Sequence, residues 1–161
     1  MQPTIAEINQ KKFIGIRMKM SLTNNRTAQL WGQFMPRRKE ILNNLNSDLV
    51  SLQVYEPGHF QNFDPNREFE KWALVKVDAV TTVPGGMEVF NCPKGMYAVF
   101  LYKGPSHDKS IFKYIFSEWL PPSAYVLDER PHFEVLGAKY KNNDPGSEEE
   151  IWIPVSLKNK V

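Results

Sequence analysis

Apolar and polar residues alternate in the first strongly patterned stretch of the chain, FIGIRMKMSL, which spans residues 13–22. Ile14, Ile16 and Met18 alternate with small or charged residues, and this period of two is typical of a half-buried strand. After the capping residues TNN the apolar residues have helical spacing, and Pro36 should kink the helix or end its first part. The first half is therefore predicted to contain a strand at 13–22, a helix at 26–45, a strand at 49–56, a loop at 57–66, a strand at 68–80 and a turn at 83–86.

The second half follows the same order. Its helix, SIFKYIFSEWL, should stop at the pair Pro121 and Pro122. Pro154 lacks an amide donor, which favours an edge or a bulge for the last strand. The predicted elements are a strand at 96–104, a helix at 110–120, a strand at 132–137, a polar turn region at 141–150 and a strand at 151–157.

Short matching segments indicate an internal repeat with an offset of about 80 to 85 residues. The matching segments are LWGQFMP (30–36) and IFSEWLP (115–121), WALVKV (72–77) and WIPVSL (152–157), and LQVY (52–55) and FEVL (133–136). We therefore predict an α+β fold that is a pseudo-symmetric duplication of a strand-helix-strand-strand unit, with an antiparallel sheet, two helices on one face and a ligand cleft. The halves should span about 12–83 and 84–158 within a single domain of residues 1–161.

Glu134 is the main candidate for chemistry. It lies in the middle of an apolar strand, on the same face as His132 and Leu136, and the repeat gives its place in the first half to the neutral Gln53. Such an asymmetry is expected for one ligand site near a pseudo-twofold axis, and equally for drift on a solvent-exposed face. In a cavity, a desolvated Glu134 has a raised pKa and can act as acid or base, whereas an ionised one suits a lipophilic cation.

Aromatic residues make up 12% of the chain, which fits either a well-filled core or an aromatic cavity. Trp119 ends the second helix, and Tyr102 lies where a strand ends, so that its phenol can donate into a pocket. The aromatic candidates for the cleft are Trp119, Tyr102, Trp31, Trp72 and Phe100.

Composition excludes several classes. With 42% hydrophobic and 24% charged residues the 161-residue chain is globular, and a net charge of +2 gives no argument for nucleic acid. No apolar run approaches the length of a membrane span or a signal peptide, and the single cysteine, Cys92, cannot form an internal disulfide. We expect a cytoplasmic protein. His59, His107 and His132 lack metal-ligand spacing and no cofactor motif is present, so neither metal nor cofactor is expected.

The order YAVFLYKGP, EWLPPSAY, DERPHFEVLG and EEEIWIPVSL resembles the GyrI-like small-molecule-binding domain, the effector-binding domain of bacterial multidrug transcription activators. The segments FIGIRMKMS, NNRTAQLWGQF and LVSLQVYE of the first half are similar to it too, so the resemblance extends from about Phe13 to Val155. It implies two strand-helix-strand-strand repeats. It also implies that the acid of the F-E pair, here Glu134, lies in an aromatic cleft that meets cationic or lipophilic drugs, with Trp119 and Tyr102 as further site residues.

The resemblance leaves three functions open. The first is a stand-alone module that binds hydrophobic or cationic xenobiotics for sensing or sequestration. The second is a hydrolase of cyclopropane-bearing toxic natural products with Glu134 as its catalytic residue, and the third is an interaction module of the gyrase-inhibitor type. Because the module starts near Phe13, we expect no helix-turn-helix domain before it, no direct binding of nucleic acid and no membrane contact. A separate regulator protein or a second copy of the chain stays open as a partner.

Overall fold

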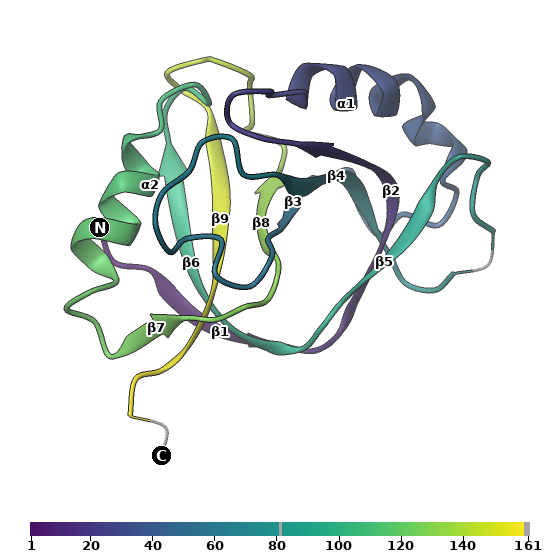
Figure 1. The fold of residues 1–161 in the computed structure, drawn as a ribbon. Coiled ribbons are helices and arrows are strands. Elements are labelled where there is room, and N and C mark those ends of the chain that lie inside the picture. Colours follow the sequence, from purple (N-terminus) through teal and green to yellow (C-terminus); the bar gives the residue numbers. More distant parts are fainter. Residues whose placement is uncertain (81, 160–161) are drawn as a thin grey trace.

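In the part of the chain that the structure describes, one antiparallel sheet of nine strands carries two short helices on one face (Figure 1). The computed structural model describes residues 1–80 and 82–159. Strands follow one another in the sheet in the order β1-β6-β9-β8-β3-β4-β2-β5, and β7 pairs with the end of β9. The elements are β1 (Thr4–Ile8), β2 (Lys11–Met20), α1 (Thr27–Phe34), the 3-10 segment η1 (Met35–Glu40), β3 (Leu49–Val54), β4 (Phe69–Val77), β5 (Glu88–Cys92), β6 (Gly95–Lys103), α2 (Ser110–Tyr114), the π-helical turn η2 (Ile115–Trp119), β7 (Tyr125–Leu127), β8 (His132–Leu136) and β9 (Glu148–Leu157).

The predicted α+β duplication is confirmed. β2-α1-β3-β4 and β6-α2-β8-β9 are the two copies, and they meet where β3 pairs with β8 at the centre of the sheet. In that ladder Leu52 lies opposite Phe133, Ser51 opposite Glu134, and Gln53 opposite His132. A twofold axis between Leu52 and Phe133 therefore exchanges Gln53 with Glu134, which is the equivalence that the repeat predicted.

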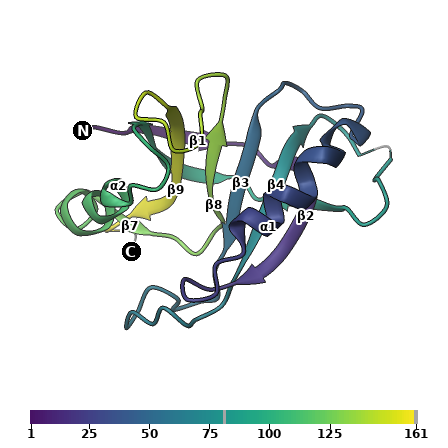
Figure 2. The same cartoon turned by 90° about the horizontal axis from the view of Figure 1, so that it is seen from above.

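The alternation of side chains divides the apolar residues between the two faces of the sheet. On the helix face, one cluster packs beneath α1 around Leu30 and Phe34, and a second packs beneath α2 around Ile111 and Ile115. A third cluster lies on the opposite face. The buried residues of this third cluster are Phe13, Val50, Leu52, Trp72, Leu74, Cys92, Tyr97 and Phe133. The centre of the helix face, over β3 and β8, is left between the two helix-covered clusters (Figure 2).

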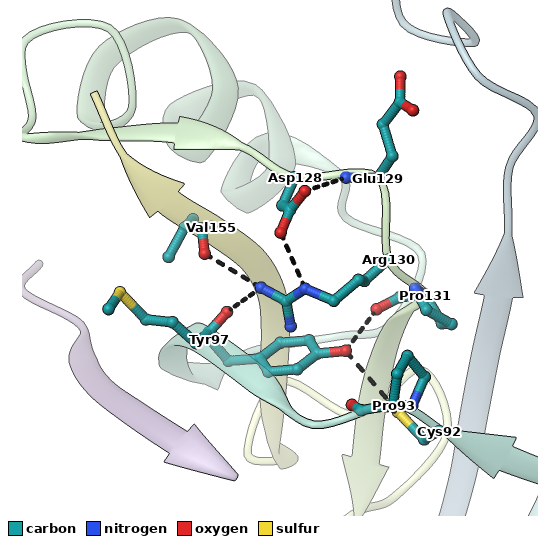
Figure 3. Close-up of polar contacts among 9 residues, drawn as sticks. Cys92, Pro93, Tyr97, Asp128, Glu129, Arg130, Pro131 and Val155 are labelled. Atoms are coloured by element: carbon teal, nitrogen blue, oxygen red, sulfur yellow. Dashed lines mark hydrogen bonds and ion pairs between the residues drawn. The ribbon is translucent and has the colours of Figure 1, made fainter. Parts of the chain in front are cut away.

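Arg130 fixes the chain where it enters β8 (Figure 3). Its Nη2 donates to the carbonyl of Met96 at 2.6 Å and to that of Val155 at 3.0 Å, while its Nε donates to Asp128 at 2.9 Å. The guanidinium also lies over the ring of Tyr97, 4.8 Å from its centre. Because these groups belong to β6, β9 and the β7–β8 connection, Arg130 ties three backbone segments together and holds the register from which β8 starts.

Several element boundaries differ from the prediction. Strands β1, β5 and β7 were not predicted, and β9 begins at Glu148 inside the expected polar turn. The first helix ends at Phe34, and the 3-10 turn that follows contains Pro36 and ends at Glu40, short of the predicted residue 45. The edge position predicted from Pro154 is wrong, because β9 lies between β6 and β8. Pro154 falls between the residues of β9 that pair with β8 and those that pair with β7.

Candidate functional site

A cavity of about 370 Å³ lies on the helix face of the sheet, over β3 and β8. Its polar floor comes from the central strands, its sides come from the start of α1 and from α2 with η2, and the loop between β3 and β4 reaches over it. The floor residues are Gln53, Phe69, Lys71, His132, Glu134 and Ile151, and the surrounding aromatic residues are Tyr55, Phe60, Phe112 and Phe116.

Strand register explains why polar groups gather there. Lys71, Gln53 and His132 form one row across β4, β3 and β8, and the next row includes Ser51 and Glu134. Residues paired across a ladder point to the same face of the sheet, and so do residues two apart along one strand, so all five side chains lie on the helix face. Gln53 Nε2 donates to Ser51 Oγ at 3.1 Å, so the buried amide uses a neighbour on its own strand. The pseudo-twofold position of this amide is taken by an acid, Glu134, so the two halves contribute different polar groups to the floor.

Glu134 is partly buried and faces this cavity. Among the described residues 1–80 and 82–159, no side chain donates a hydrogen bond to its carboxylate and no cation lies within 4.0 Å of it. The Glu134 carboxylate nevertheless shifts the pKa of neighbouring groups. Burial raises the pKa of Tyr55, and the Glu134 carboxylate raises it further. Burial and then Glu134 also raise the pKa of Glu149, on β9, to about 7.

Aromatic rings enclose one end of the cavity. The Phe60 ring stacks on Phe116 with 5.6 Å between ring centres and on His132 with 5.3 Å. Tyr55 packs edge-on against both Phe60, at 4.7 Å, and His132, at 5.0 Å. Burial, with a smaller contribution from His59, lowers the pKa of His132 to about 3. His132 is therefore a neutral ring at neutral pH, and this end of the cavity presents aromatic faces without a positive charge.

Lys71 and Lys109 also line the cavity. Neither was predicted from the sequence as a site residue. Lys71 Nζ donates to Thr27 Oγ1 at 3.2 Å, and Lys109 Nζ lies 5.6 Å from the centre of the Phe112 ring. Burial lowers the pKa of Lys71, Lys109 lowers it further, and Glu134 and Glu149 act in the opposite direction. The predicted strand contained the signal for Lys71, because that residue has the same parity as the core residues Ala73 and Val75.

Three of the predicted aromatic site residues belong to the core beneath α2, outside the lining of this cavity. Phe100 is fully buried and packs edge-on against Trp119 at 5.2 Å. Trp119 stacks on Tyr125 at 6.1 Å and borders a separate surface recess beside the N-terminal residues. Tyr102 donates its hydroxyl to the carbonyl of Pro105 at 2.8 Å. The physical reason is that these rings fill the space between the helical segment α2–η2 and strands β6 and β9.

The remaining two also lie elsewhere. Trp31 packs with the cluster beneath α1, edge-on to Phe34 at 5.9 Å. Trp72 has the opposite parity from Lys71, so it points to the other face of the sheet, where its Nε1 donates to Glu70 at 2.7 Å. Six residues were predicted for the site. Among the described residues that line the cavity, Glu134 is the one that belongs to this set.

Within residues 1–80 and 82–159, no group of three or more His, Cys, Asp or Glu side chains is arranged to hold a metal ion. In the same part of the chain, none of the helices has the length and apolar character needed to cross a bilayer.

The sequence model of the family described as Cass2, integron-associated effector binding protein, matches residues 4–155. The transcriptional regulator BrlR of Pseudomonas aeruginosa is 28% identical over 157 residues, which cover 96% of this chain and 56% of BrlR. The chain therefore spans about half the length of this curated relative.

Solved structures share the fold. SAV2435, in a structure bound to tetraphenylphosphonium, superposes with a TM-score of 0.66 at 18% identity, covering 97% of this chain and 94% of that one. An integron cassette protein from Vibrio cholerae superposes with a TM-score of 0.67 at 14% identity, covering 96% of each chain. The GyrI-like fold expected from the resemblance is confirmed by the family match and by these structures.

Proposed function

The chain belongs to the Cass2 family of integron-associated effector-binding proteins, and from this premise we propose that it binds hydrophobic small molecules that carry a positive charge. The ligand would occupy the cavity over β3 and β8. The observation that carries this proposal is one half-buried carboxylate, Glu134, without an ion-pair partner among the described residues, in a cavity surrounded by aromatic rings.

Physical chemistry favours a lipophilic cation at this position. Aromatic faces carry partial negative charge and attract a cation that has lost its water, and they also bury the apolar surface of the ligand. The cavity volume of about 370 Å³ lies in the range of pockets that hold compact drug-sized molecules. A cation next to Glu134 would supply the counter-charge that no described side chain provides within 4.0 Å. SAV2435, which has the same fold, has been solved with such a cation, tetraphenylphosphonium.

Binding of this kind serves sensing or sequestration of xenobiotics. BrlR, which matches nearly the whole chain over half of its own length, is a transcriptional regulator. We propose that the chain senses its ligand as an effector module, and that any effect on transcription passes through a partner regulator or a second copy of the chain.

Calorimetric titration with tetraphenylphosphonium tests the proposal. Wild type should bind, and Glu134→Gln should lose roughly tenfold or more in affinity, because about 1.4 kcal/mol of charge interaction corresponds to a factor of ten. The matched control is Glu129→Gln, which removes an exposed carboxylate just before β8 and should bind like wild type. Equal affinities of wild type and Glu134→Gln, or an absence of binding by wild type, would contradict the proposal.

A further inference from the structure

The two lysines in the cavity lining are not neutralised by contact. Within residues 1–80 and 82–159, neither Lys71 nor Lys109 has a carboxylate within 4.0 Å. Glu134, in the same cavity, has no cation within that distance. The cavity therefore holds charges of both signs that face one space without pairing with each other.

Lys71 has unused hydrogen-bonding capacity. An ammonium group carries three N–H donors, and the contact with Thr27 Oγ1 accounts for one of them. No other acceptor among the described residues lies within hydrogen-bond distance. Lys71 is partly buried on the floor, and burial without a counter-charge is unfavourable for an ammonium. Burial is the largest cause of the lowered pKa of Lys71, and Lys109 lowers it further, whereas Glu134 and Glu149 act in the opposite direction without contacting the ammonium. An anionic group beside Nζ would relieve both effects.

Strand geometry separates the acid from this cationic side. Glu134 lies opposite Ser51 on β3, whereas Lys71 lies opposite Gln53 on the other edge of β3. Their backbones are thus two strand spacings apart and offset by two residues, which amounts to about 12 Å. Lys109 stands at the start of α2, exposed at the mouth of the cavity. A single ligand of moderate size can reach both the acid and the lysines.

We propose that the effector of this protein is a zwitterion: an aromatic or lipophilic cation that also carries a carboxylate. The cationic centre lies at Glu134 among the aromatic rings, and the carboxylate lies between Lys71 and Lys109. This inference rests on the proposed function, since it adds a second contact to the same cavity. It distinguishes the site from one that accepts any lipophilic cation, because a ligand without the carboxylate leaves two cations in the lining unpaired.

The competing explanation is that the lysines compensate Glu134 and Glu149 through solvent and take no part in binding. In that case a carboxylate on the ligand would gain nothing, because it would be repelled by the acids as much as it is attracted by the lysines. The two explanations therefore predict opposite responses to esterification of the ligand.

The test uses (4-carboxybutyl)triphenylphosphonium, which is zwitterionic at neutral pH, and its methyl ester, which is a simple cation. Both are titrated calorimetrically at pH 7.5 into wild type and into Lys71→Met, Lys109→Gln, Glu134→Gln and Lys113→Gln. Lys113→Gln is the matched control, because Lys113 is an exposed lysine one turn further along α2 and outside the cavity lining. Lys109 is exposed, so its variant decides the matter even if Lys71→Met fails to fold.

We expect wild type to bind the acid about tenfold more tightly than the ester, as a charge-assisted hydrogen bond provides. Each variant in the lysine pair should reduce this preference, and Lys113→Gln should retain it. Equal binding of acid and ester by wild type, or a preference that survives both lysine substitutions, would overturn the zwitterion inference. If the ester binds and depends on Glu134 in that case, the proposed function stands. If neither compound binds, both proposals fail.

Discussion

At the scale of single residues, Glu149 links the charge of the cavity to the stability of the fold. Burial is the largest cause of its raised pKa of about 7, Glu134 adds to it, and Lys109 and Lys71 oppose it. An acid with a raised pKa in the folded state contributes stability below its unfolded pKa of 4.5 and loses that contribution as the pH rises through 7. The full shift corresponds to about 3 kcal/mol, which partial solvent exposure reduces to roughly 1–2 kcal/mol.

Glu149→Gln removes this titration. Relative to wild type, the variant should be about 1–2 kcal/mol more stable at pH 8, and the difference should shrink toward zero near pH 5. Urea unfolding at the two pH values measures it. Glu129→Gln, which changes an exposed carboxylate, should show no such pH dependence. A stability difference for Glu149→Gln that is the same at pH 5 and pH 8 would contradict this account.

At the scale of elements, the β3–β4 loop covers the cavity and contacts η2 through one ring. Phe60 is 48% exposed in this loop, yet it stacks on both Phe116 and His132. Arg67 holds the loop in shape, since its guanidinium donates to the carbonyls of His59, Gln61 and Asn62. The loop is therefore internally braced, and its connection to the far wall of the cavity depends on the Phe60 ring.

Phe60→Ala should accordingly weaken both ligand binding and the fold. We expect tetraphenylphosphonium to dissociate about tenfold faster, because stacking with two rings is worth about 0.5–1.5 kcal/mol for each pair. The melting temperature should fall by several degrees, because the same stacking contributes to the stability of the free protein. Stopped-flow displacement measures the dissociation rate, and Phe63→Ala is the control in the same loop, since Phe63 is 80% exposed and makes no ring contact among the described residues. Equal rates for the two variants would exclude a gating role for Phe60.

The sequence pattern predicted the strands and helices whose apolar residues form one regular face. It missed the strands that form because they pair with a strand distant in the sequence. Alternation and the repeat were enough to locate strands β2, β3, β4, β6, β8 and β9, both helices and the equivalence of Gln53 with Glu134. Strands β1, β5 and β7 could not be predicted, because each is stabilised by pairing with a strand elsewhere in the fold. The local alternation of apolar and polar residues does not reveal that pairing. Alternation along β4 is enough to place Lys71 and Trp72 on opposite faces of the sheet. The packing of Phe60 could not be predicted in this way, because contacts between a loop and distant elements leave no periodic pattern in the sequence.

At the scale of the whole molecule, the two halves exchange their edge strands. β1 directly precedes β2 in the chain but pairs with β6 of the second copy, and β5 directly precedes β6 but pairs with β2 of the first copy. The ladder between β3 and β8 joins the halves a third time. Figure 1 shows β1 and β5 running to opposite sides of the sheet. Because each half completes the sheet of the other, neither can lose its structure without exposing the edge and core of its neighbour.

Unfolding should therefore be one cooperative transition, and a ligand bound between the halves should stabilise both by the same amount. Variants that keep a single tryptophan, either Trp31 on α1 or Trp119 at the end of η2, report on the two halves separately. Within each variant, the urea midpoint followed by tryptophan fluorescence should coincide with the midpoint followed by far-UV circular dichroism. Tetraphenylphosphonium at one hundred times its dissociation constant should raise each free energy of unfolding by about 2.7 kcal/mol. Separate midpoints, or stabilisation seen only at one tryptophan, would mean that the halves unfold independently and that the ligand contacts one of them alone.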